Sequence, residues 1–375
     1  MRTKRFLLSL GSIFYRYVVK RIFFTINPEH MHNGMTKFGE RLGTSPIAKQ
    51  ILSSILTSSY PTLHQTVAGI QFSTPVGLAA GFDYEGRLTQ ILPSVGFGLQ
   101  TIGTITNMAY EGNPRPLLGR LPRSRSLMVN KGFKNAGAAA MVKKLQRMSF
   151  RIPVGISIGR TNSTLLKTQK QSILDIVQAF TLFEKSHVHH SYYELNISCP
   201  NLFGDITFYP PKNLRELLTE VDALHLKRPV FIKMPIEKSD EEVLQMLEVI
   251  AKHSVAGVII GNLQKNRNDP SLVQSEVRKF STGAFSGKPT FNRSNELIAL
   301  CYKHYKPMTV IGCGGVFSGE DAYKKIRLGA TLIQLITGMI FQGPQLIAQI
   351  NQDLSDYLKR DKLQTISEAV GLDVS

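Results

Sequence analysis

Short apolar runs alternate with longer amphipathic stretches from Val67 onward, and this alternation limits the possible folds more than any other feature. Strands that read as near-continuous apolar runs are typical of a parallel sheet that is covered on both faces. Eight such units in about 290 residues predict an α/β fold, a (β/α)8 TIM barrel. The expected strands are residues 76–80, 99–103, 154–159, 193–198, 230–234, 257–261, 309–312 and 332–337.

The same alternation divides the chain into segments. The barrel is expected over residues 63–358, with a helical extension before it and a tail, 359–375, that carries no usable motif. Amphipathic stretches after the strands predict the barrel helices. They are residues 173–185, 214–225, 240–252, 294–304, 319–328 and 344–358.

Residues 1–26 combine an apolar helical face with a high density of cations. Phe6, Leu10, Ile13, Phe14 and Tyr17 recur at helical spacing. The apolar stretch is far shorter than the roughly 20 residues that a spanning helix needs. We expect a basic amphipathic helix in the membrane interface; the alternative is a helix packed on the protein's own core. The cations are Arg2, Lys4, Arg5, Arg16, Lys20 and Arg21.

Residues 27–62 predict a pair of helices between this segment and the barrel. Asn27 followed by Pro28 is a helix start, because asparagine caps the first turn and proline fits its first position. Ser45 is the expected cap of a second helix, which runs to about Leu56.

The chain is strongly basic, with 45 Lys and Arg against 27 Asp and Glu and a formal net charge of +18. Such a surplus favours lipid headgroups, nucleic acid or acidic small molecules as partners. No motif of a nucleic-acid-binding domain is present, so we expect no nucleic-acid partner. Cys199, Cys301 and Cys313 show no paired spacing, which predicts a reducing compartment and no metal site.

Strand 193–198 delivers two amides and a thiol to the place where barrel enzymes keep their chemistry, the C-terminal ends of the strands. Asn196 and Asn201 flank Cys199. Amides orient a planar polar ligand, and a thiol can move a proton near neutral pH. The alternative is a buried strand whose asparagines cap a turn.

Other strand ends carry further polar or small residues. Ala80 and Gly81 would let a flat ring approach the backbone. Lys233 lies within an apolar run, and a buried lysine is costly unless it is paired, so we expect it to face an anionic ligand rather than solvent. Thr104, Ser157 and Asn262 complete the strand-end set.

A phosphate site is expected after the last two strands, where backbone N–H groups hold phosphate in many barrels of this type. Gly314 and Gly315 follow one strand, and Thr337 and Gly338 follow the other, with Gly287 in a preceding loop. Together with Lys233, this arrangement predicts a bound flavin mononucleotide, FMN.

Over residues 27–350 the chain resembles the dihydroorotate dehydrogenase family. That resemblance implies an FMN barrel that oxidises dihydroorotate to orotate in pyrimidine synthesis. The helical extension is similar to that of the membrane-associated, quinone-reducing class. The motifs that carry the resemblance are PVGLAAGFD at 75–83, GNPRP at 112–116, NISCPN at 196–201, SGKP at 286–289, IGCGG at 311–315 and FQGP at 341–344.

The resemblance also implies roles for individual residues. Cys199 would take the proton from C5 of the substrate, and His32 and Arg120 would line the quinone entrance. The substrate would be held by Asn130, Asn196, Asn201 and Asn262. FMN would be held by Ala80, Gly81, Thr104, Ser157, Lys233, Gly287, Gly314, Gly315, Thr337 and Gly338.

Several positions depart from the family pattern. Cys199 stands where the membrane class has serine, and Tyr84 stands where the family has a lysine that meets substrate and flavin. Ser157 and Ile336 replace an asparagine and a tyrosine, and the loop at 131–135 is one residue short. We expect Lys131 or Lys134 to supply the missing cation.

The expected partners are dihydroorotate or orotate, a membrane quinone and the membrane surface, on the cytoplasmic side of the inner or cell membrane. The loop 202–212, with Phe203, Phe208 and Tyr209, is expected to close over the substrate. Two alternatives stay open. One is a related FMN enzyme that uses fumarate, NAD or another dihydropyrimidine; the other is a basic barrel without catalysis.

Overall fold

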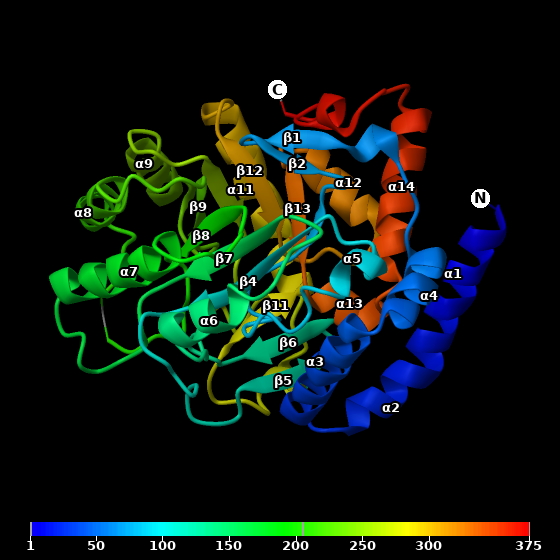
Figure 1. Cartoon of the computed structure of the whole chain (residues 1–375), viewed down its shortest axis with the longest axis horizontal. Helices are drawn as coiled ribbons and strands as arrows, with labels where there is room; N and C mark the ends of the chain where they lie inside the picture. The colour runs from blue at the N-terminus through cyan, green and yellow to red at the C-terminus, as the bar shows by residue number, and fades with distance from the viewer. Residues whose placement is uncertain (1, 205, 375) are drawn as a thin grey trace.

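The computed structural model describes residues 2–204 and 206–374, and eight parallel strands within them close into a barrel (Figure 1). Every barrel strand is buried along its length, except at the two ends of the strand that begins at Thr309. The predicted (β/α)8 fold is therefore confirmed. In barrel order the strands are β10 (Gly257–Ile260), β12 (Thr309–Cys313), β13 (Leu332–Leu335), β3 (Val76–Leu78), β4 (Leu99–Ile105), β7 (Val154–Ile158), β8 (Tyr192–Asn196) and β9 (Val230–Met234).

Helices cover the outside of the barrel, and several begin at a local sequence signal. Thr168 and Ser239 each form a capping box with the glutamine or glutamate three residues later. The covering helices are α6 (Ala138–Leu145), α7 (Gln169–Glu184), α8 (Pro211–Asp222), α9 (Asp240–Ile250), α11 (Phe291–His304), α12 (Gly319–Arg327) and α14 (Leu346–Arg360). Shorter turns are α5 (Leu92–Val95) and α10 (Gln274–Val277).

A short hairpin closes one end of the barrel. Its strands, β1 (Gln65–Val67) and β2 (Ile70–Phe72), place Val67 and Phe72 in a buried cluster with residues from the N-terminal parts of the barrel strands. The opposite, C-terminal end is thereby left for ligands.

A three-stranded antiparallel sheet was not foreseen from the sequence. It joins β5 (Leu118–Leu121), β6 (Ser126–Val129) and β11 (Ala284–Gly287), in the order β11-β6-β5. The sheet brings the loop after β4 against the loop before α11.

The helical extension has the predicted pair of helices. Asn27 accepts hydrogen bonds from the backbone N–H groups of Glu29 and His30, at 2.9 and 3.3 Å, and begins α3 (Pro28–Thr44). Ser45 caps α4 (Pro46–Leu56). Before them, α1 (Arg2–Phe14), a π-helical turn (Tyr15–Val19) and α2 (Lys20–Thr25) form one nearly continuous rod.

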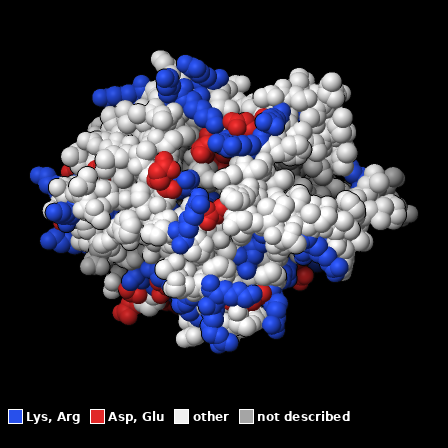
Figure 2. Space-filling model, turned by 90° about the horizontal axis from the view of Figure 1, so that it is seen from below, with Lys and Arg blue, Asp and Glu red and all other residues white. Residues whose placement is uncertain are grey.

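Most apolar side chains of this rod face outward. Leu8 is buried, whereas Phe6, Leu10, Phe14 and Tyr17 are exposed. Figure 2 shows the molecule from below, where wide areas of the surface carry neither basic nor acidic side chains. No helix in residues 2–204 and 206–374 is both long and apolar enough to cross a bilayer.

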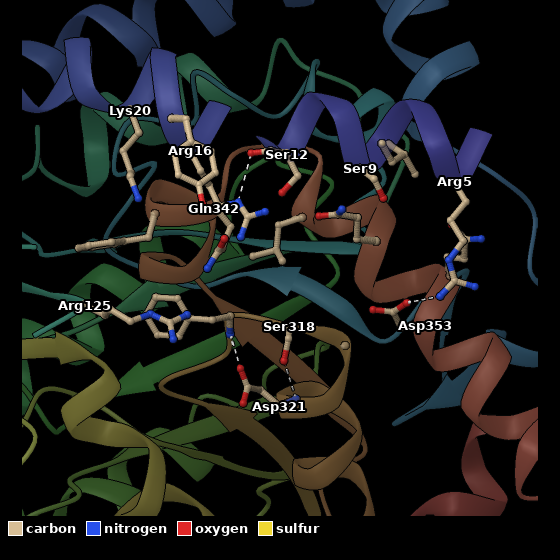
Figure 3. Close-up of a pocket in the computed structure, with 18 of the residues that line it drawn as sticks. Arg5, Ser9, Ser12, Arg16, Lys20, Arg125, Ser318, Asp321, Gln342 and Asp353 are labelled. Atoms are coloured by element: carbon tan, nitrogen blue, oxygen red, sulfur yellow. Dashed lines mark hydrogen bonds and ion pairs between the residues drawn. The ribbon is translucent and has the colours of Figure 1, made fainter. Parts of the chain in front are cut away.

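Residues near both ends of the described chain contact the barrel helices. Near the N-terminus, Arg5 lies 3.7 Å from Asp353 of α14 (Figure 3). It also lies 3.0 Å from Asp356 of the same helix. After α14, the tail folds back, buries Ile366 and places Asp373 against Arg327 of α12.

Candidate active site

A cavity lies at the C-terminal end of the barrel, where the polar strand-end residues meet. Because parallel strands end on the same rim, residues far apart in sequence converge there. The sequence-predicted residues that line it are Ala80, Gly81, Thr104, Asn196, Cys199, Asn201, Lys233, Asn262 and Thr337.

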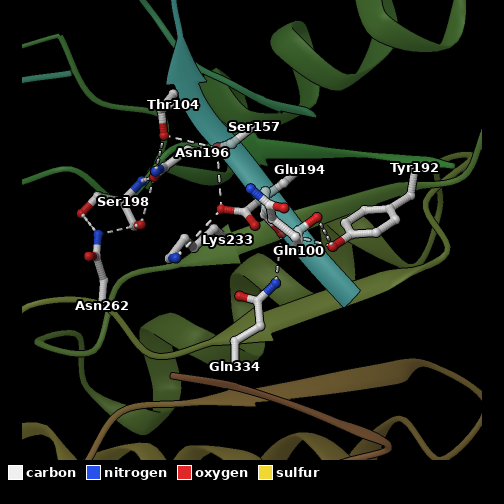
Figure 4. A network of polar contacts seen from close by, with 11 residues as sticks. Gln100, Thr104, Ser157, Tyr192, Glu194, Asn196, Ser198, Lys233, Asn262 and Gln334 are labelled. Atoms are coloured by element: carbon white, nitrogen blue, oxygen red, sulfur yellow. Dashed lines mark hydrogen bonds and ion pairs between the residues drawn. The ribbon is translucent and has the colours of Figure 1, made fainter. Parts of the chain in front are cut away.

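Hydrogen bonds fix the orientation of two of the asparagines (Figure 4). Asn196 Nδ2 donates to Thr104 Oγ1 at 2.8 Å, and Ser198 Oγ donates to Asn196 Oδ1 at 2.9 Å. Asn262 Nδ2 donates to the carbonyl and hydroxyl oxygens of Ser198, at 2.7 and 2.6 Å. The Asn262 amide nitrogen is therefore committed to the protein, and its oxygen is available to a donor on a ligand.

Lys233 has a counter-charge within the protein, and the sequence predicts that it also faces an anionic ligand. Its Nζ lies 3.5 Å from Glu194 Oε1, which also accepts a hydrogen bond from Ser157 Oγ at 3.2 Å (Figure 4). Burial by itself lowers the pKa of Lys233, but the Glu194 carboxylate, together with Cys313 and Cys199, raises that pKa above its usual value. Lys233 is thus a permanent cation at the cavity wall.

Cys199 lies on the loop after β8, at the cavity. Burial raises the pKa of its thiol to about 12, although the Asn201 backbone N–H and the charges of Lys265, Arg160 and Lys233 act in the opposite direction. The thiol therefore keeps its proton at neutral pH, in contrast to the sequence-based expectation that it can move a proton near that pH.

Asn130 is placed differently from the other three predicted asparagines. Its amide nitrogen donates to the Pro114 carbonyl at 3.1 Å, and its oxygen accepts a hydrogen bond from Asn113 at 3.1 Å. Asn113 also donates to the Asn201 carbonyl at 2.9 Å. Within the described residues, Asn130 is not part of the cavity lining. Asn113, which the sequence analysis missed, links Asn130 to the loop of Asn201.

The two candidate replacement cations differ in their surroundings. Lys131 Nζ lies 4.6 Å from the centre of the Tyr84 ring and 3.4 Å from the Gly81 carbonyl oxygen. Lys134 is engaged by Glu111, with Nζ 2.9 Å from its carbonyl and 3.4 Å from its carboxylate. Burial lowers the pKa of Lys131 to about 7. Of the two lysines, Lys131 is therefore the one whose ammonium group is not engaged by a carboxylate of the described residues.

The predicted phosphate cradle is assembled from three segments: the end of β11, the turn after β12 and the start of α13 (Thr337–Gln342). A Cβ added at Gly287 would lie 2.8 Å from Thr337 Cγ2, and one at Gly338 would lie 1.9 Å from the Val316 carbonyl. Gly315 has a φ of +70°, which favours glycine. In the described part of the chain, the N–H groups of Gly315, Thr337 and Gly338 donate to no protein acceptor.

These features fit FMN. Free N–H groups suit a phosphate, as at other turns that bind anions. At Gly81, with a φ of +102°, an added Cβ would meet no atom within 4 Å, so the cavity is open beside it for a flat ring. Ser157 Oγ lies 2.9 Å from Thr104 Oγ1, and the hydrogen bond between the two hydroxyls fixes the orientation of Thr104.

A second, mainly apolar cavity of about 360 Å³ lies between the N-terminal helices and the barrel. It shares wall residues with the first cavity, so the two adjoin. The shared residues are His32, Phe82, Leu118, Leu127 and Ile340. Burial, reinforced by Lys131 and Arg87, holds the pKa of His32 well below its ordinary value, so this imidazole is neutral.

Arg120, which the family resemblance predicts at the quinone entrance, borders the apolar cavity. Its Nη1 donates to the carbonyl groups of Phe24 and Ile26, at 3.2 and 2.6 Å, and its guanidinium lies 4.7 Å from the centre of the Phe24 ring. These contacts connect β5 of the antiparallel sheet to the C-terminal end of α2.

The expected lid is anchored by two residues that the sequence analysis missed. Arg160 Nη2 donates to the Phe203 carbonyl at 2.6 Å, and the Phe203 N–H donates to Asn162 Oδ1 at 2.6 Å. Phe208 is buried. Residue 205 lies outside the described residues, and closure of this loop stays a prediction.

Comparisons with known proteins agree with this geometry. The family described as dihydroorotate dehydrogenase matches residues 62–358. A Corynebacterium diphtheriae dihydroorotate dehydrogenase (quinone) is 31% identical over 372 residues, which cover 99% of this chain and 98% of that protein. A Crocosphaera subtropica protein of the same name is 34% identical and covers 92% and 94%.

The fold has a similar solved structure. The Eimeria tenella enzyme in complex with ferulenol superposes with a TM-score of 0.81 at 26% sequence identity. The match covers 92% of this chain and 96% of that one.

Proposed function

The chain belongs to the dihydroorotate dehydrogenase family, which implies a flavin, and on that premise we propose that it oxidises dihydroorotate with FMN and passes the electrons to a membrane quinone. The observation that carries the proposal is the pair of adjoining cavities. One is polar and bears the amides, Cys199 and Lys233; the other is apolar and opens between the N-terminal helices.

Substrate binding is assigned to the polar cavity. Dihydroorotate is a six-membered ring with carbonyl and N–H groups and one carboxylate, and Asn196, Asn201 and Asn262 offer matching amide groups. Lys131 is the proposed partner of the carboxylate, because its ammonium group has no carboxylate within salt-bridge distance among the described residues. Tyr84 supports it through the face of its ring.

Cys199 is the proposed base that removes the proton from C5. When bound, FMN supplies the two-electron acceptor for this oxidation. Lys233 and the cradle of Gly287, Gly315 and Thr337 would hold FMN against the substrate. Lys265, Arg160 and Lys233 favour the thiolate form of Cys199 and so assist its role as a base.

The apolar cavity is the proposed quinone site, bordered by His32 and Arg120. A neutral, buried histidine and an apolar wall suit a neutral ring with a long hydrocarbon tail. The exposed apolar residues of α1 and α2, with their neighbouring cations, support peripheral attachment to the cytoplasmic side of the inner or cell membrane.

The test is a pair of half-reactions on the purified, FMN-loaded protein. We expect dihydroorotate to bleach the flavin absorbance without oxygen, and a ubiquinone or menaquinone analogue to restore it. Parallel reactions with fumarate and with NAD are the controls for the acceptor. Restoration by fumarate or NAD but not by a quinone would favour the related FMN enzyme instead, and a protein that binds no flavin would exclude both.

A further inference from the structure

A basic cleft of about 930 Å³ lies between the N-terminal rod and the barrel, apart from the two cavities of the candidate active site (Figure 3). One wall is formed by α1, the π-helical turn and α2. The other is formed by the β5–β6 turn, the loop before α12 and the ends of α13 and α14. The proposed oxidation gives this cleft no role.

Cations from both walls meet in the cleft. Arg16 and Lys20 point from the rod toward Arg125, which belongs to the β5–β6 turn (Figure 3). Arg21 lines the same space. Burial lowers the pKa of Lys20, and the neighbouring charges of Arg16, Arg125 and Arg21 lower it further. These side chains therefore repel one another at short range.

The protein does not neutralise this group. Within the described residues, Arg16, Lys20, Arg21 and Arg125 have no carboxylate within 4.0 Å, whereas Arg5, at the far end of the cleft, is paired with α14. Two carboxylates face the cleft. Asp353 belongs to the Arg5 pair, and Asp321 accepts a hydrogen bond from the Phe317 N–H at 2.9 Å.

Contacts with the protein hold the cationic side chains of the cleft in place. The Arg125 guanidinium lies 4.2 Å from the centre of the Phe317 ring, and Arg16 Nε donates to the Ser12 carbonyl at 3.3 Å. Lys20 Nζ lies 6.0 Å from the centre of the Phe341 ring. Guanidinium groups held in this way match the geometry of a phosphate.

The rod that supplies three of these cations, Arg16, Lys20 and Arg21, also carries the exposed apolar side chains. Phe14, Tyr17 and Val18 adjoin Arg16 in sequence and are 60%, 59% and 42% exposed. We propose that the cleft binds the phosphate of an anionic phospholipid, with the acyl chains lying along this apolar face. This proposal rests on the membrane association of the proposed function and specifies its lipid partner.

The site would hold the rod against the barrel. Arg16 and Lys20 come from the rod, and Arg125 comes from the barrel, so one phosphate contacts both. Tyr15, between Arg16 and Phe14, donates to the Ile340 carbonyl at 2.9 Å and lines the apolar cavity. Lipid binding would therefore stabilise the wall of the proposed quinone site.

The experiment measures binding of the FMN-loaded, full-length protein to phosphatidylcholine vesicles with and without a minor fraction of phosphatidylglycerol. We expect the wild type to prefer the anionic vesicles. The double variant Arg16→Gln/Lys20→Gln should lose roughly tenfold or more of that preference, and Arg125→Gln alone should lose about fivefold, because each cation near anionic lipid adds comparable affinity.

A charge-matched control separates the cleft from general attraction to the membrane. Lys37 and Arg41 are exposed cations of α3 that do not line the cleft, so Lys37→Gln/Arg41→Gln should reduce the preference much less. An equal loss in both double variants, with no effect of Arg125→Gln, would overturn the proposal.

Two further arms identify the ligand and check the fold. Inorganic phosphate and glycerol 3-phosphate should compete only weakly, since they lack acyl chains; full displacement by either would assign the cleft to a soluble phosphate and overturn the lipid proposal. Turnover with a short-chain, water-soluble quinone should be unchanged in every variant. A wild type that turns over such quinones but shows no anionic preference would refute the lipid site and leave the proposed oxidation standing.

Discussion

At the scale of single residues, Cys199 sets the expected pH dependence of the oxidation. A base must first lose its own proton, and burial raises the pKa of this thiol to about 12, so the reactive fraction grows as the pH rises. We expect kcat to increase through the alkaline range. Cys199→Ser should retain some activity only at still higher pH, because a hydroxyl is less acidic than a thiol, and Cys199→Ala should lose far more.

The measurement is kcat against pH for the three proteins, at saturating dihydroorotate and quinone analogue. Flavin content, read from absorbance, controls for loss of the cofactor. If Cys199→Ala matched the wild type, Cys199 would be removed from the mechanism.

Lys131 offers a second prediction at this scale. Its pKa of about 7 means that the ligand-free side chain is protonated below pH 7 and loses its proton as the pH rises. An anionic substrate binds best to the protonated form, so the apparent KM for dihydroorotate should rise above pH 7. Lys131→Ala should raise that KM roughly tenfold or more at pH 6, since a hydrogen bond between charged groups contributes about 1.5–3 kcal/mol, and should flatten its pH dependence.

Lys134→Ala is the matched control, because Glu111 already engages this lysine. It should change the KM little. An unchanged KM in Lys131→Ala, or a larger effect in Lys134→Ala, would exclude Lys131 as the carboxylate partner.

Lys325 couples stability to pH. It is fully buried on α12, and its Nζ donates to Ser294 Oγ at 2.6 Å and to Asn295 Oδ1 at 2.8 Å. Burial lowers its pKa from 10.5 to about 7, so between these values the unfolded chain binds the proton that the folded chain has lost. The free energy of unfolding should therefore rise with pH, by roughly 2 to 5 kcal/mol across this range.

Denaturant unfolding of the flavin-free protein at several pH values between 7 and 10.5 measures this slope. Lys325→Met cannot titrate, so its slope should be smaller than that of the wild type at equal pH. Parallel curves for the two proteins would contradict the assignment.

At the scale of elements, the N-terminal rod is predicted to serve the acceptor rather than the substrate. Tyr15, Phe23 and Phe24 form part of the apolar cavity wall, whereas the polar cavity takes no residue from α1 or α2. Removal of residues 1–26 should leave dihydroorotate-dependent bleaching of the flavin intact. It should reduce turnover with a long-chain quinone by at least about tenfold, because the tail loses its apolar contacts.

Stopped-flow absorbance separates the two half-reactions in this truncated protein. A flavin bleached as fast as in the full chain shows that the barrel has folded. Unimpaired reoxidation by the long-chain quinone would contradict the assignment of the rod to the quinone site.

At the scale of the whole molecule, the cofactor site joins segments from distant parts of the chain, so its ligand should stabilise the fold. A ligand that binds only the folded state at 100 times its Kd adds about 2.7 kcal/mol. Removal of FMN should therefore lower the thermal midpoint, and added FMN should restore it. Riboflavin, which lacks the phosphate, should restore it only in part if Gly315, Thr337 and Gly338 bind the phosphate; equal rescue by both would contradict that cradle.

The sequence alone determined the barrel, its eight strands and the composition of the strand ends. Strands buried on both faces must be apolar over their whole length, so each strand could be predicted from its own residues. The helix caps Asn27 and Ser45 could also be predicted from local sequence, because a capping side chain bonds to backbone N–H groups within three residues. Asn196, Cys199 and Lys233 were found because strand ends in a barrel share one rim.

Only the tertiary structure decided which side chains meet. Several contacts join residues from separate segments. They are the pairing of β6 with β11, the ion pair of Lys233 with Glu194, the hydrogen bond between Asn113 and Asn130, and the contact of Lys134 with Glu111, which leaves Lys131 as the less engaged of the two lysines. The basic cleft likewise needs Arg16 and Arg125 on opposite walls. Burial of a strand is a property of its own residues, whereas the charge state and orientation of a polar side chain depend on neighbours that only the folded chain brings within a few ångströms.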